Sequence, residues 1–389
     1  MSYKPLFARA LASDPQRLHF AAHSHHLWPD ASYDGHLRAW ADAARFADRK
    51  WEVIFGEVVP EAQGHVAAEL GLPSPASVVF ATNTHELLVR LRSALERRPV
   101  RVLSSDGEFH SFRRQAARWE EAGEITLERV PLAPFDSFAA RFVAAARRGG
   151  HDLIQVSQVF FRTGQVFDKL AELAALADPD GPWVVIDAYH GFMAVETDLS
   201  PFADRLFYMA GGYKYAMAGE GAAFLHAPPG FGPRPTVTGW FAEFGDLQGP
   251  PGGVGYATDG GRFWGATFDA SGLYRFNAVR RMLADQGLDT ARATAHAREL
   301  QHRFARAVAA GSAGAQLAGA ELLNPLEGDA SHARFLAYRH PDAPRWKAAL
   351  QAAQVMTDVR DDVIRFGFGL YQDPEDVDRL IEACAETLG

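Results

Sequence analysis

The chain has 389 residues, of which 48% are hydrophobic and 22% are charged, and its formal net charge is −9. This length and hydrophobic content favour one large domain and a smaller one with a sizeable buried core. The acidic balance lacks the basic footprint of a protein that binds nucleic acid or an anionic membrane surface, and the single cysteine, Cys384, excludes an internal disulfide framework.

The first residues, MSYKPLFARALASDPQ, lack the long apolar segment of a signal peptide, and no stretch is apolar enough to span a bilayer. We therefore expect a cytoplasmic protein with no membrane partner. The next segment, AHSHHLWPD, carries His23, His25 and His26. Their spacing matches no zinc pattern, so we expect a plain loop or the mouth of a substrate site, with no metal.

Short apolar runs then alternate with helical patterns along the chain. ASVVFA precedes HELLVRLRSALERR, VRVLSS precedes FRRQAARWEEAG, and LIQVSQVFF precedes DKLAELAALAD; WVVID, RLFYMAG and AAFLHAP follow. This alternation predicts an α/β fold whose mostly parallel sheet is flanked by helices on both faces.

A stretch rich in Gly and Pro, from residue 228 to about 272, predicts a long functional or interface loop. Beyond it, a long helical pattern, two strand patterns (ARFLAYRH and DVIRFGFG) and a last helix capped by Asp373 predict a smaller α+β domain. We expect an N-terminal segment at 1–45 that packs with the small domain and the active-site mouth, a large domain at 46–275 and a small domain at 276–389.

Ligands of open parallel sheets bind at the carboxyl ends of the strands, so the residues that follow each run are candidates. After the first run, Asn83 and Thr84 begin a helix whose free N–H groups could bind a phosphate, although Thr84 could simply be a cap. Phe109 follows the second run and could lie flat on a planar ring or belong to the core. Ser157 lies in the third run, and Arg162 follows it.

Asp187 ends the WVVID run, with His190 three residues later. A buried carboxylate needs a positive charge, which could be an arginine or the protonated ring nitrogen of a cofactor. Lys214 lies in GGYKYAMAGEG and is either a surface lysine or a desolvated amine able to attack an aldehyde.

Together these groups fit pyridoxal 5'-phosphate (PLP), which needs a phosphate site, a stacked aromatic ring, an acid for its ring nitrogen and a lysine for its aldehyde. In this interpretation Lys214 forms the Schiff base. Asp187 keeps the pyridine protonated, so that the ring acts as an electron sink.

Five segments resemble the PLP-dependent class V aminotransferase superfamily, and are most similar to kynureninase: FFRTGQVFD, DAYHG, GGYKYAMAGEGAAFLH, TGWFAEFG and DVIRFGFGLYQDPEDVDRL. The resemblance extends over nearly the whole chain. It implies the PLP-dependent transferase fold type I and a homodimer with its active sites at the interface.

The resemblance also implies roles for individual residues. Lys214 would be the catalytic lysine and Arg365 would bind the substrate carboxylate through a two-pronged ion pair. The residues expected at the cofactor are Asn83, Thr84, Phe109, Ser157, Asp187, His190, Tyr213, Trp240 and Thr267, the last from the partner subunit.

Five positions depart from the kynureninase pattern. His23 and Ser24 replace the start of an Asn-Ser-Leu-Gly motif, and Arg162, Phe112 and Thr267 stand where Tyr, Asp and Asn are usual. By analogy these positions surround the substrate, so we expect His23, Ser24 and Arg162 to contact it, and Arg162 to favour a more acidic substrate tail.

The leading functional hypothesis is hydrolytic Cβ–Cγ cleavage of an α-amino acid, as in kynureninase. The alternatives are transamination or β-elimination on the same scaffold. Cysteine desulfurase chemistry is disfavoured, because it needs a mobile loop cysteine and Cys384 falls in the last predicted helix. A non-catalytic PLP-binding protein is disfavoured by the presence of Lys214, Asp187 and Arg365 together, and a nucleotide-binding protein by the lack of a P-loop.

Overall fold

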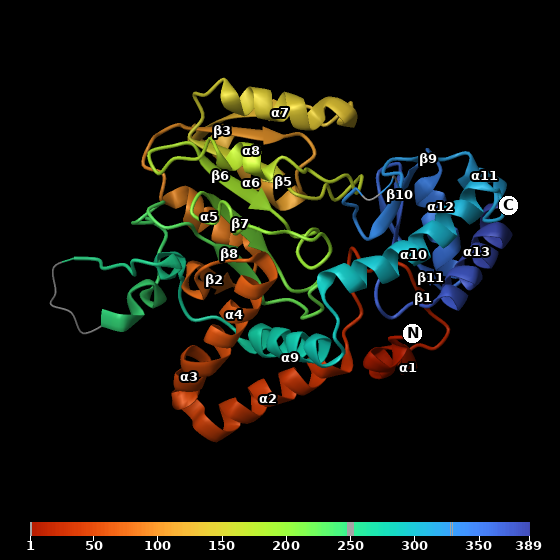
Figure 1. The fold of residues 1–389 in the computed structure, drawn as a ribbon, viewed down its shortest axis with the longest axis horizontal. Coiled ribbons are helices and arrows are strands. Elements are labelled where there is room, and N and C mark those ends of the chain that lie inside the picture. The colour runs from red at the N-terminus through yellow and green to blue at the C-terminus, as the bar shows by residue number, and fades with distance from the viewer. Residues whose placement is uncertain (1, 247–252, 327, 329) are drawn as a thin grey trace.

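The computed structural model describes residues 2–246, 253–326, 328 and 330–389. A larger body holds the central sheet, and the C-terminal residues form a smaller body beside it (Figure 1). No helix in these described ranges is both long and apolar enough to cross a membrane.

The central sheet has seven strands in the order β2-β8-β7-β6-β5-β3-β4, and within the described residues only β8 runs antiparallel to its neighbours. Its strands are β2 (Val78–Ala81), β3 (Val100–Ser105), β4 (Ile125–Val130), β5 (Leu153–Ser157), β6 (Trp183–Asp187), β7 (Leu206–Ala210) and β8 (Ala223–His226). Every residue of β2, β5, β7 and β8 is buried, which explains their continuous apolar runs. The predicted fold class is confirmed.

One strand of this sheet was not predicted. β4 lies at the sheet edge and reads ITLERV, with buried residues only at its two ends. Because an edge strand exposes much of its surface, its sequence carries charges and lacks the apolar run that identifies the central strands.

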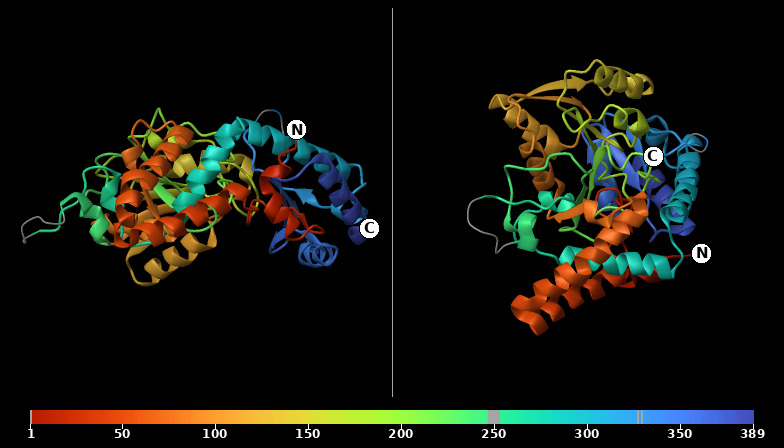
Figure 2. Two further views of the ribbon diagram at one scale, coloured as in Figure 1. Left: turned by 90° about the horizontal axis from the view of Figure 1, so that it is seen from below. Right: turned by 60° about the vertical axis from the view of Figure 1, so that its left-hand side comes forward.

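Helices cover both faces of the sheet (Figures 1 and 2). They are α5 (Thr84–Ser93), α6 (His110–Glu121), α7 (Phe138–Arg147), α8 (Leu170–Ala174), α2 (Asp30–Phe46), α3 (Lys50–Val53), α4 (Val59–Leu70) and α9 (Ser271–Asp285). α2 and α9 lie side by side. Gly35 allows this contact, because a Cβ atom there would lie 2.6 Å from the backbone oxygen of Tyr274.

The smaller body has an antiparallel sheet in the order β12-β13-β10-β9. Its elements are β9 (Glu321–Leu322), β10 (Phe335–Arg339), β12 (Asp358–Arg360), β13 (Val363–Gly367), α10 (Thr290–Ala309), α11 (Ala315–Ala318), α12 (Ala343–Ala352) and α13 (Pro374–Leu388). Near the N-terminus, α1 (Ala8–Ala12) precedes β1 (Leu18–His19), and β1 pairs in parallel with β11 (Val355–Met356). The N-terminal segment is therefore joined to the smaller body.

Two large hydrophobic cores correspond to the two bodies. The first includes Leu273 of α9 and Ala293 of α10, together with Leu370 and Tyr371 from near the C-terminus, whereas Ala297 belongs to the second core together with Leu18 and Phe20. The change of core therefore falls within α10. The domain boundaries expected at residues 45 and 275 stay predictions.

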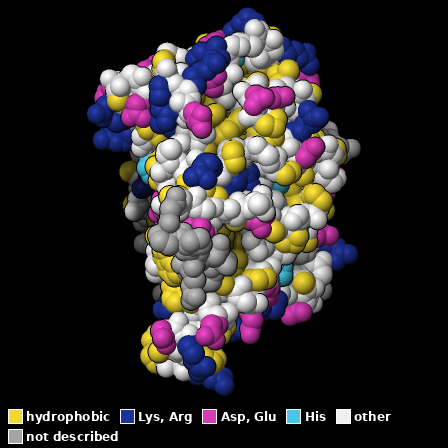
Figure 3. Space-filling model, turned by 90° about the vertical axis from the view of Figure 1, so that its left-hand side faces the viewer, with side chains coloured by type: hydrophobic (Ala, Val, Ile, Leu, Met, Phe, Trp, Pro, Cys, Tyr) yellow, Lys and Arg dark blue, Asp and Glu magenta, His cyan; other side chains and the backbone are white. Residues whose placement is uncertain are grey.

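The remaining helical segments are short: η1 (Lys4–Phe7), η2 (Ala47–Arg49), the π-helix η3 (Ile54–Val58), η4 (Pro75–Ser77), η5 (Phe135–Ser137), η6 (Trp240–Asp246) and η7 (Gly260–Phe263). The last two lie in the predicted loop-rich stretch. Val237, Trp240 and Val254 of that stretch are exposed. Hydrophobic side chains lie between charged ones on the face shown in Figure 3.

The predicted N-cap of α13 can be tested by its contribution to the free energy of unfolding. Asp373 caps it, and a reciprocal bond runs from the Asp373 N–H to Asp376 Oδ2 at 2.8 Å. We expect Asp373→Ala to lower the free energy of unfolding by about 1 kcal/mol, because helix N–H groups lose their acceptor. Urea denaturation would measure it. Glu382→Ala, an exposed change in the same helix, should leave the midpoint nearly unchanged; equal effects of both changes would contradict the cap.

Candidate active site

A cavity of about 260 Å³ lies at the carboxyl ends of β5 and β6. Eight residues singled out from the sequence line it: Asn83, Thr84, Phe109, Ser157, Asp187, His190, Tyr213 and Lys214. Gln155, Tyr189 and Phe161 also line it and were not predicted. The structure thus brings the predicted lysine, acid, aromatic ring and helix N-terminus together in one place.

Lys214 is buried in the loop after β7. Its Nζ donates a hydrogen bond to the backbone oxygen of His23 at 2.8 Å and lies 3.5 Å from that of Ser24. Burial, together with the nearby Arg365 guanidinium, lowers the pKa of Lys214 to about 7. The alternative of an ordinary surface lysine is therefore wrong.

Glycines allow the lysine loop to approach its surroundings closely. A Cβ atom on Gly211 would lie 2.2 Å from Tyr189 Oη, and one on Gly212 would lie 2.9 Å from the backbone oxygen of Gly219. Larger residues at these two positions would push the loop away from the sheet. The glycines before Lys214 thus serve its placement.

Asp187 ends β6 directly opposite Ser157 of β5. Its Oδ1 accepts a hydrogen bond from the Tyr189 N–H at 3.1 Å, and burial raises its pKa to about 6. Among the described residues, no arginine or lysine forms an ion pair with Asp187. The structure therefore favours a ligand cation as its partner over the arginine considered from the sequence.

The N-terminus of α5 borders the same cavity. Asn83 is its N-cap and accepts a hydrogen bond from the Glu86 N–H at 3.0 Å, while Thr84 is the first helical residue. The capping role considered for Thr84 thus belongs to Asn83. The Thr84 side chain and the first-turn N–H groups border the cavity, where a phosphate would find donors.

Two predicted cofactor residues lie outside the cavity lining. Trp240 and Thr267 are exposed, and Trp240 Nε1 donates a hydrogen bond to Thr267 Oγ1 at 3.3 Å. Their expected contacts with the phosphate and across a subunit interface stay predictions.

Arg365 of β13, predicted to bind the substrate, is buried, does not line the cavity, and donates a hydrogen bond to the backbone oxygen of Phe161. It also forms an ion pair with Asp358, whose other oxygen lies 2.6 Å from Arg360 Nη1. Asp358 was missed by the sequence analysis. The β12–β13 hairpin places it opposite Arg365, so a predicted hairpin register could have identified it.

His23 is fully buried beside this ion pair. Its ring stacks on Phe335 with centroids 4.6 Å apart, and its Nε2 lies 3.9 Å from Asp358 Oδ2. Neither ring nitrogen has a hydrogen-bond partner in the described part of the chain, and neither His23 nor Ser24 lines the cavity, so their expected substrate contacts stay predictions. Arg162 instead forms an ion pair with Asp362 at 2.6 Å and does not line the cavity.

The other N-terminal histidines do not form a metal site with His23. The His25 ring stacks on Tyr213, whereas His26 is buried with Nδ1 2.7 Å from the backbone oxygen of Leu27. Burial lowers the pKa of His26 to about 3. Across the described ranges, no three His, Cys, Asp or Glu residues are grouped so that they could bind a metal ion.

Glu108 is a further buried carboxyl near the cavity that the sequence did not reveal. It precedes Phe109 in a turn-like segment, yet it is 0% exposed and hydrogen-bonds to Ser105 and Ser157. Burial raises its pKa to about 7. Nothing in the local sequence marks this acid as buried.

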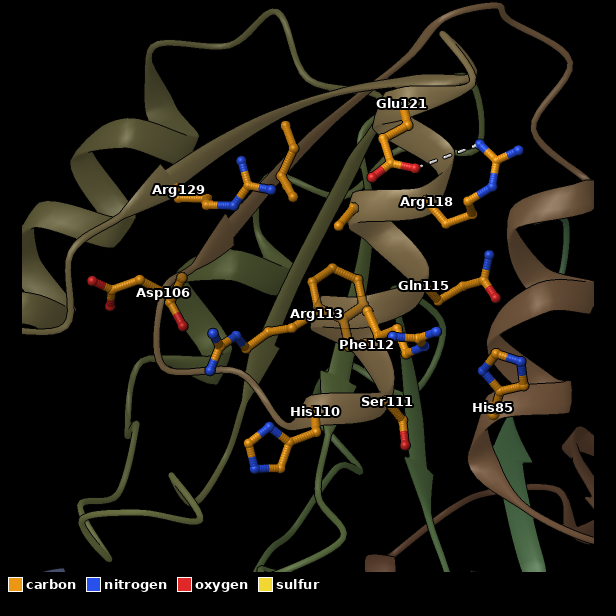
Figure 4. Close-up of a pocket in the computed structure, with 14 residues that line it drawn as sticks. His85, Asp106, His110, Ser111, Phe112, Arg113, Gln115, Arg118, Glu121 and Arg129 are labelled. Atoms are coloured by element: carbon orange, nitrogen blue, oxygen red, sulfur yellow. Dashed lines mark ion pairs between the residues drawn. The ribbon is translucent and has the colours of Figure 1, made fainter. Parts of the chain in front are cut away.

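An open cleft of about 990 Å³ lies along α6 (Figure 4). It shares His85, Ser111 and Phe112 with the cofactor cavity. Its other lining residues include Arg113, Arg114, Arg118 and Arg129, with Arg118 3.8 Å from Glu121. The approach to the cavity from this side is thus basic, although the chain as a whole is acidic.

Comparisons with known proteins agree with this architecture. Residues 294–384, which include Arg365, match the family model of the kynureninase C-terminal domain. None of the curated proteins matches the chain.

Solved structures match over nearly the full length. A complex of the cystine C-S lyase C-DES with its product cysteine persulfide has a TM-score of 0.78 and 17% identity, covering 98% of this chain and 100% of that one. A C-DES variant with glycine covalently linked to its PLP cofactor has a TM-score of 0.80, 18% identity and 100% coverage of both chains. Apo cysteine desulfurase from Thermococcus onnurineus NA1 has a TM-score of 0.77 and 18% identity, covering 97% and 96%. The chain has the PLP-dependent transferase fold type I.

The lowered pKa of Lys214 provides a test in the cofactor-free protein. Because an amine attacks an aldehyde only when neutral, we expect the rate of PLP binding to rise as the pH increases through about 7 and to level off by about pH 9. Stopped-flow absorption from pH 5 to 10 would measure it, with Lys214→Ala as the unreactive control. A midpoint near the ordinary lysine value would contradict the assigned burial of Lys214.

Proposed function

We propose that the chain is a PLP-dependent enzyme that acts on an α-amino acid by β-elimination. The observation that carries this proposal is that Lys214, buried with a lowered pKa, shares one cavity with Asp187, a carboxyl with no cationic partner among the described side chains. A reactive amine and an acid for a ring nitrogen are the two groups that PLP requires of its protein.

The other lining residues fit the remaining parts of the cofactor. Asn83, Thr84 and the α5 N-terminus would hold the phosphate, Phe109 would cover one face of the ring, and Asp187 would accept the ring N–H. When bound, PLP supplies an electron sink for the charge that develops at the substrate Cα.

The residues of this chain then perform proton transfer and substrate orientation. At neutral pH a large fraction of Lys214 is unprotonated, so Nζ can remove the Cα proton once it is free. Arg365, bonded to Asp358 and Phe161, would bind the substrate carboxylate, and His23, whose ring nitrogens are unpartnered, would lie beside it.

Two observations favour elimination over thiol-dependent desulfuration. C-DES, which shares the fold, is named as a cystine C-S lyase. The chain's own Cys384 is fully buried in α13, and burial raises the pKa of its thiol to about 12, so it cannot accept sulfur as an exposed thiolate. Elimination needs no such thiol: the Cα–H proton leaves, and the Cβ–substituent bond breaks as the Cα–Cβ double bond forms.

The second candidate is kynureninase-type hydrolysis, which the match of residues 294–384 favours. Against it, Phe112 stands in the cavity where an acid is expected by analogy, and Arg162 is held by Asp362 away from the lining.

We also propose a homodimer. Tyr33, Leu37 and Trp40 on α2 are 45%, 47% and 72% exposed and lie on one face of the helix. Such an exposed apolar stripe is typical of a surface covered by another subunit. The stripe continues toward a groove between α2 and α9 that Trp40, Trp51 and Phe268 line.

The dimer proposal predicts that Leu37→Asp with Trp40→Asp yields monomers, because charge in the stripe would have to be desolvated on association. Sedimentation equilibrium should give twice the chain mass for the native protein and once for the variant. Ala352→Asp, an exposed change in α12, is the control and should remain dimeric. A native protein that is monomeric at all concentrations would contradict the proposal.

The elimination proposal predicts that the PLP-loaded protein releases pyruvate and ammonia from cystine or a related β-substituted amino acid. Lys214→Ala should lower turnover by about 10²–10⁴-fold, because the general base is lost. Lys169→Ala, which replaces a half-buried lysine that does not line the cavity, should retain activity. Anthranilate from kynurenine, without pyruvate from cystine, would instead support the second candidate; full activity of Lys214→Ala would overturn both.

A further inference from the structure

We propose that Glu108 is a positioning residue of the cofactor cavity, which fixes Ser157 as a hydrogen-bond acceptor beside Asp187. This inference rests on the proposed PLP site and names a residue that acts through Ser157 without lining the cavity itself. The bond from Ser157 to Glu108 makes the side of the cavity formed by β5 and β6 selective for a ligand group that donates hydrogen bonds.

The contacts of Glu108 define its orientation. Its Oε2 accepts from Ser157 Oγ at 2.6 Å, and its Oε1 accepts from Ser105 Oγ at 2.6 Å and from the Ser157 N–H at 3.3 Å. Ser105 Oγ in turn accepts from the Gly107 N–H at 3.2 Å. Both carboxyl oxygens of Glu108 therefore accept hydrogen bonds from residues of β3 and β5, and these bonds hold the side chain away from the cavity.

The bond to Ser157 decides what that residue offers to a ligand. A serine hydroxyl has one proton, which ionised Glu108 accepts, so Ser157 Oγ then presents only lone pairs on its remaining side. Ser157 lies opposite Asp187 in the β5–β6 register, and both line the cavity. Two acceptors therefore stand side by side where the ring nitrogen of PLP would bind, and they favour a protonated nitrogen over an unprotonated one.

The charges around Glu108 support this arrangement. Asp187 on β6 is the charged group whose field reaches Glu108, and together with burial it keeps the pKa of Glu108 raised to about 7. Ser105 on β3 and Ser157 on β5 stabilise the ionised form through hydrogen bonds. A buried acid held beside another acid costs stability, which is typical of groups retained for a functional site.

The test is a double-mutant cycle on PLP affinity. Binding is measured as the quenching of tryptophan fluorescence when PLP is added to the cofactor-free protein. We expect Glu108→Gln and Ser157→Ala each to weaken PLP binding by about tenfold, and the double variant to be no weaker than the poorer single variant. Deazapyridoxal phosphate, whose ring has C–H in place of nitrogen, should bind the native protein and Glu108→Gln equally. Additive losses, or equal losses for PLP and the analogue, would overturn the inference.

A matched control and a second measurement separate this inference from the proposed function. Glu69→Gln removes a carboxyl of 12% side-chain exposure that bonds to Arg280 and Thr290 away from the cavity, and it should leave PLP affinity unchanged. In the cofactor-free protein, ¹³C NMR should show Glu108 titrating near pH 7 and moving lower in Asp187→Asn. If PLP binds and Glu108→Gln leaves its affinity unchanged, the inference is wrong and the proposed function stands; if PLP does not bind but Asp187→Asn lowers the pKa of Glu108, only the proposed function fails.

Discussion

The exclusion of water from Lys214 is the constraint on which the rest of the site depends. A lysine side chain in water stays protonated at neutral pH, whereas burial lowers its pKa and favours the neutral amine. In this chain the exclusion requires three separate parts: the glycine loop after β7, the cavity walls from β5 and β6, and the N-terminal segment, whose His23 carbonyl accepts the bond from Nζ. The reactivity of one side chain thus depends on contacts from both bodies of the protein.

The same desolvation organises the acids and cations around the lysine. Asp187 and Glu108 both have raised pKa values because burial disfavours their charged forms, and Arg365 has a lowered pKa for the same reason. The pKa values of Lys214 and Glu108, both about 7, and of Asp187, about 6, are therefore close to neutral pH. Asp358 instead forms ion pairs with Arg360 and Arg365, which compensate its charge. This contrast separates the acids near the cavity from the ion-paired acid of the smaller body.

The sequence predicted the parts of this site that follow from strand order. Asp187, Ser157 and Lys214 come directly after or within apolar runs, and parallel strands bring such residues to one edge. Glu108 and Asp358 could not be found in this way, because the burial of an acid depends on partners that are distant in the sequence. The edge strand β4 was missed for a related reason: its exposed charges hide the strand pattern. Arg162 was assigned to the substrate by analogy, yet an acid in the β12–β13 turn engages it.

The pairing of β1 with β11 has a consequence for changes made at the N-terminus of the protein, such as truncation or fusion. β1 fixes the chain to the smaller body, and only a few residues later the same chain supplies the carbonyl groups that face Lys214. The N-terminal segment therefore forms part of the surroundings that keep water from Lys214. Shortening the chain at this end, or pulling it aside with a bulky fused partner, would hydrate the amine and return it to an unreactive ammonium ion, even with every residue of the sheet still in place.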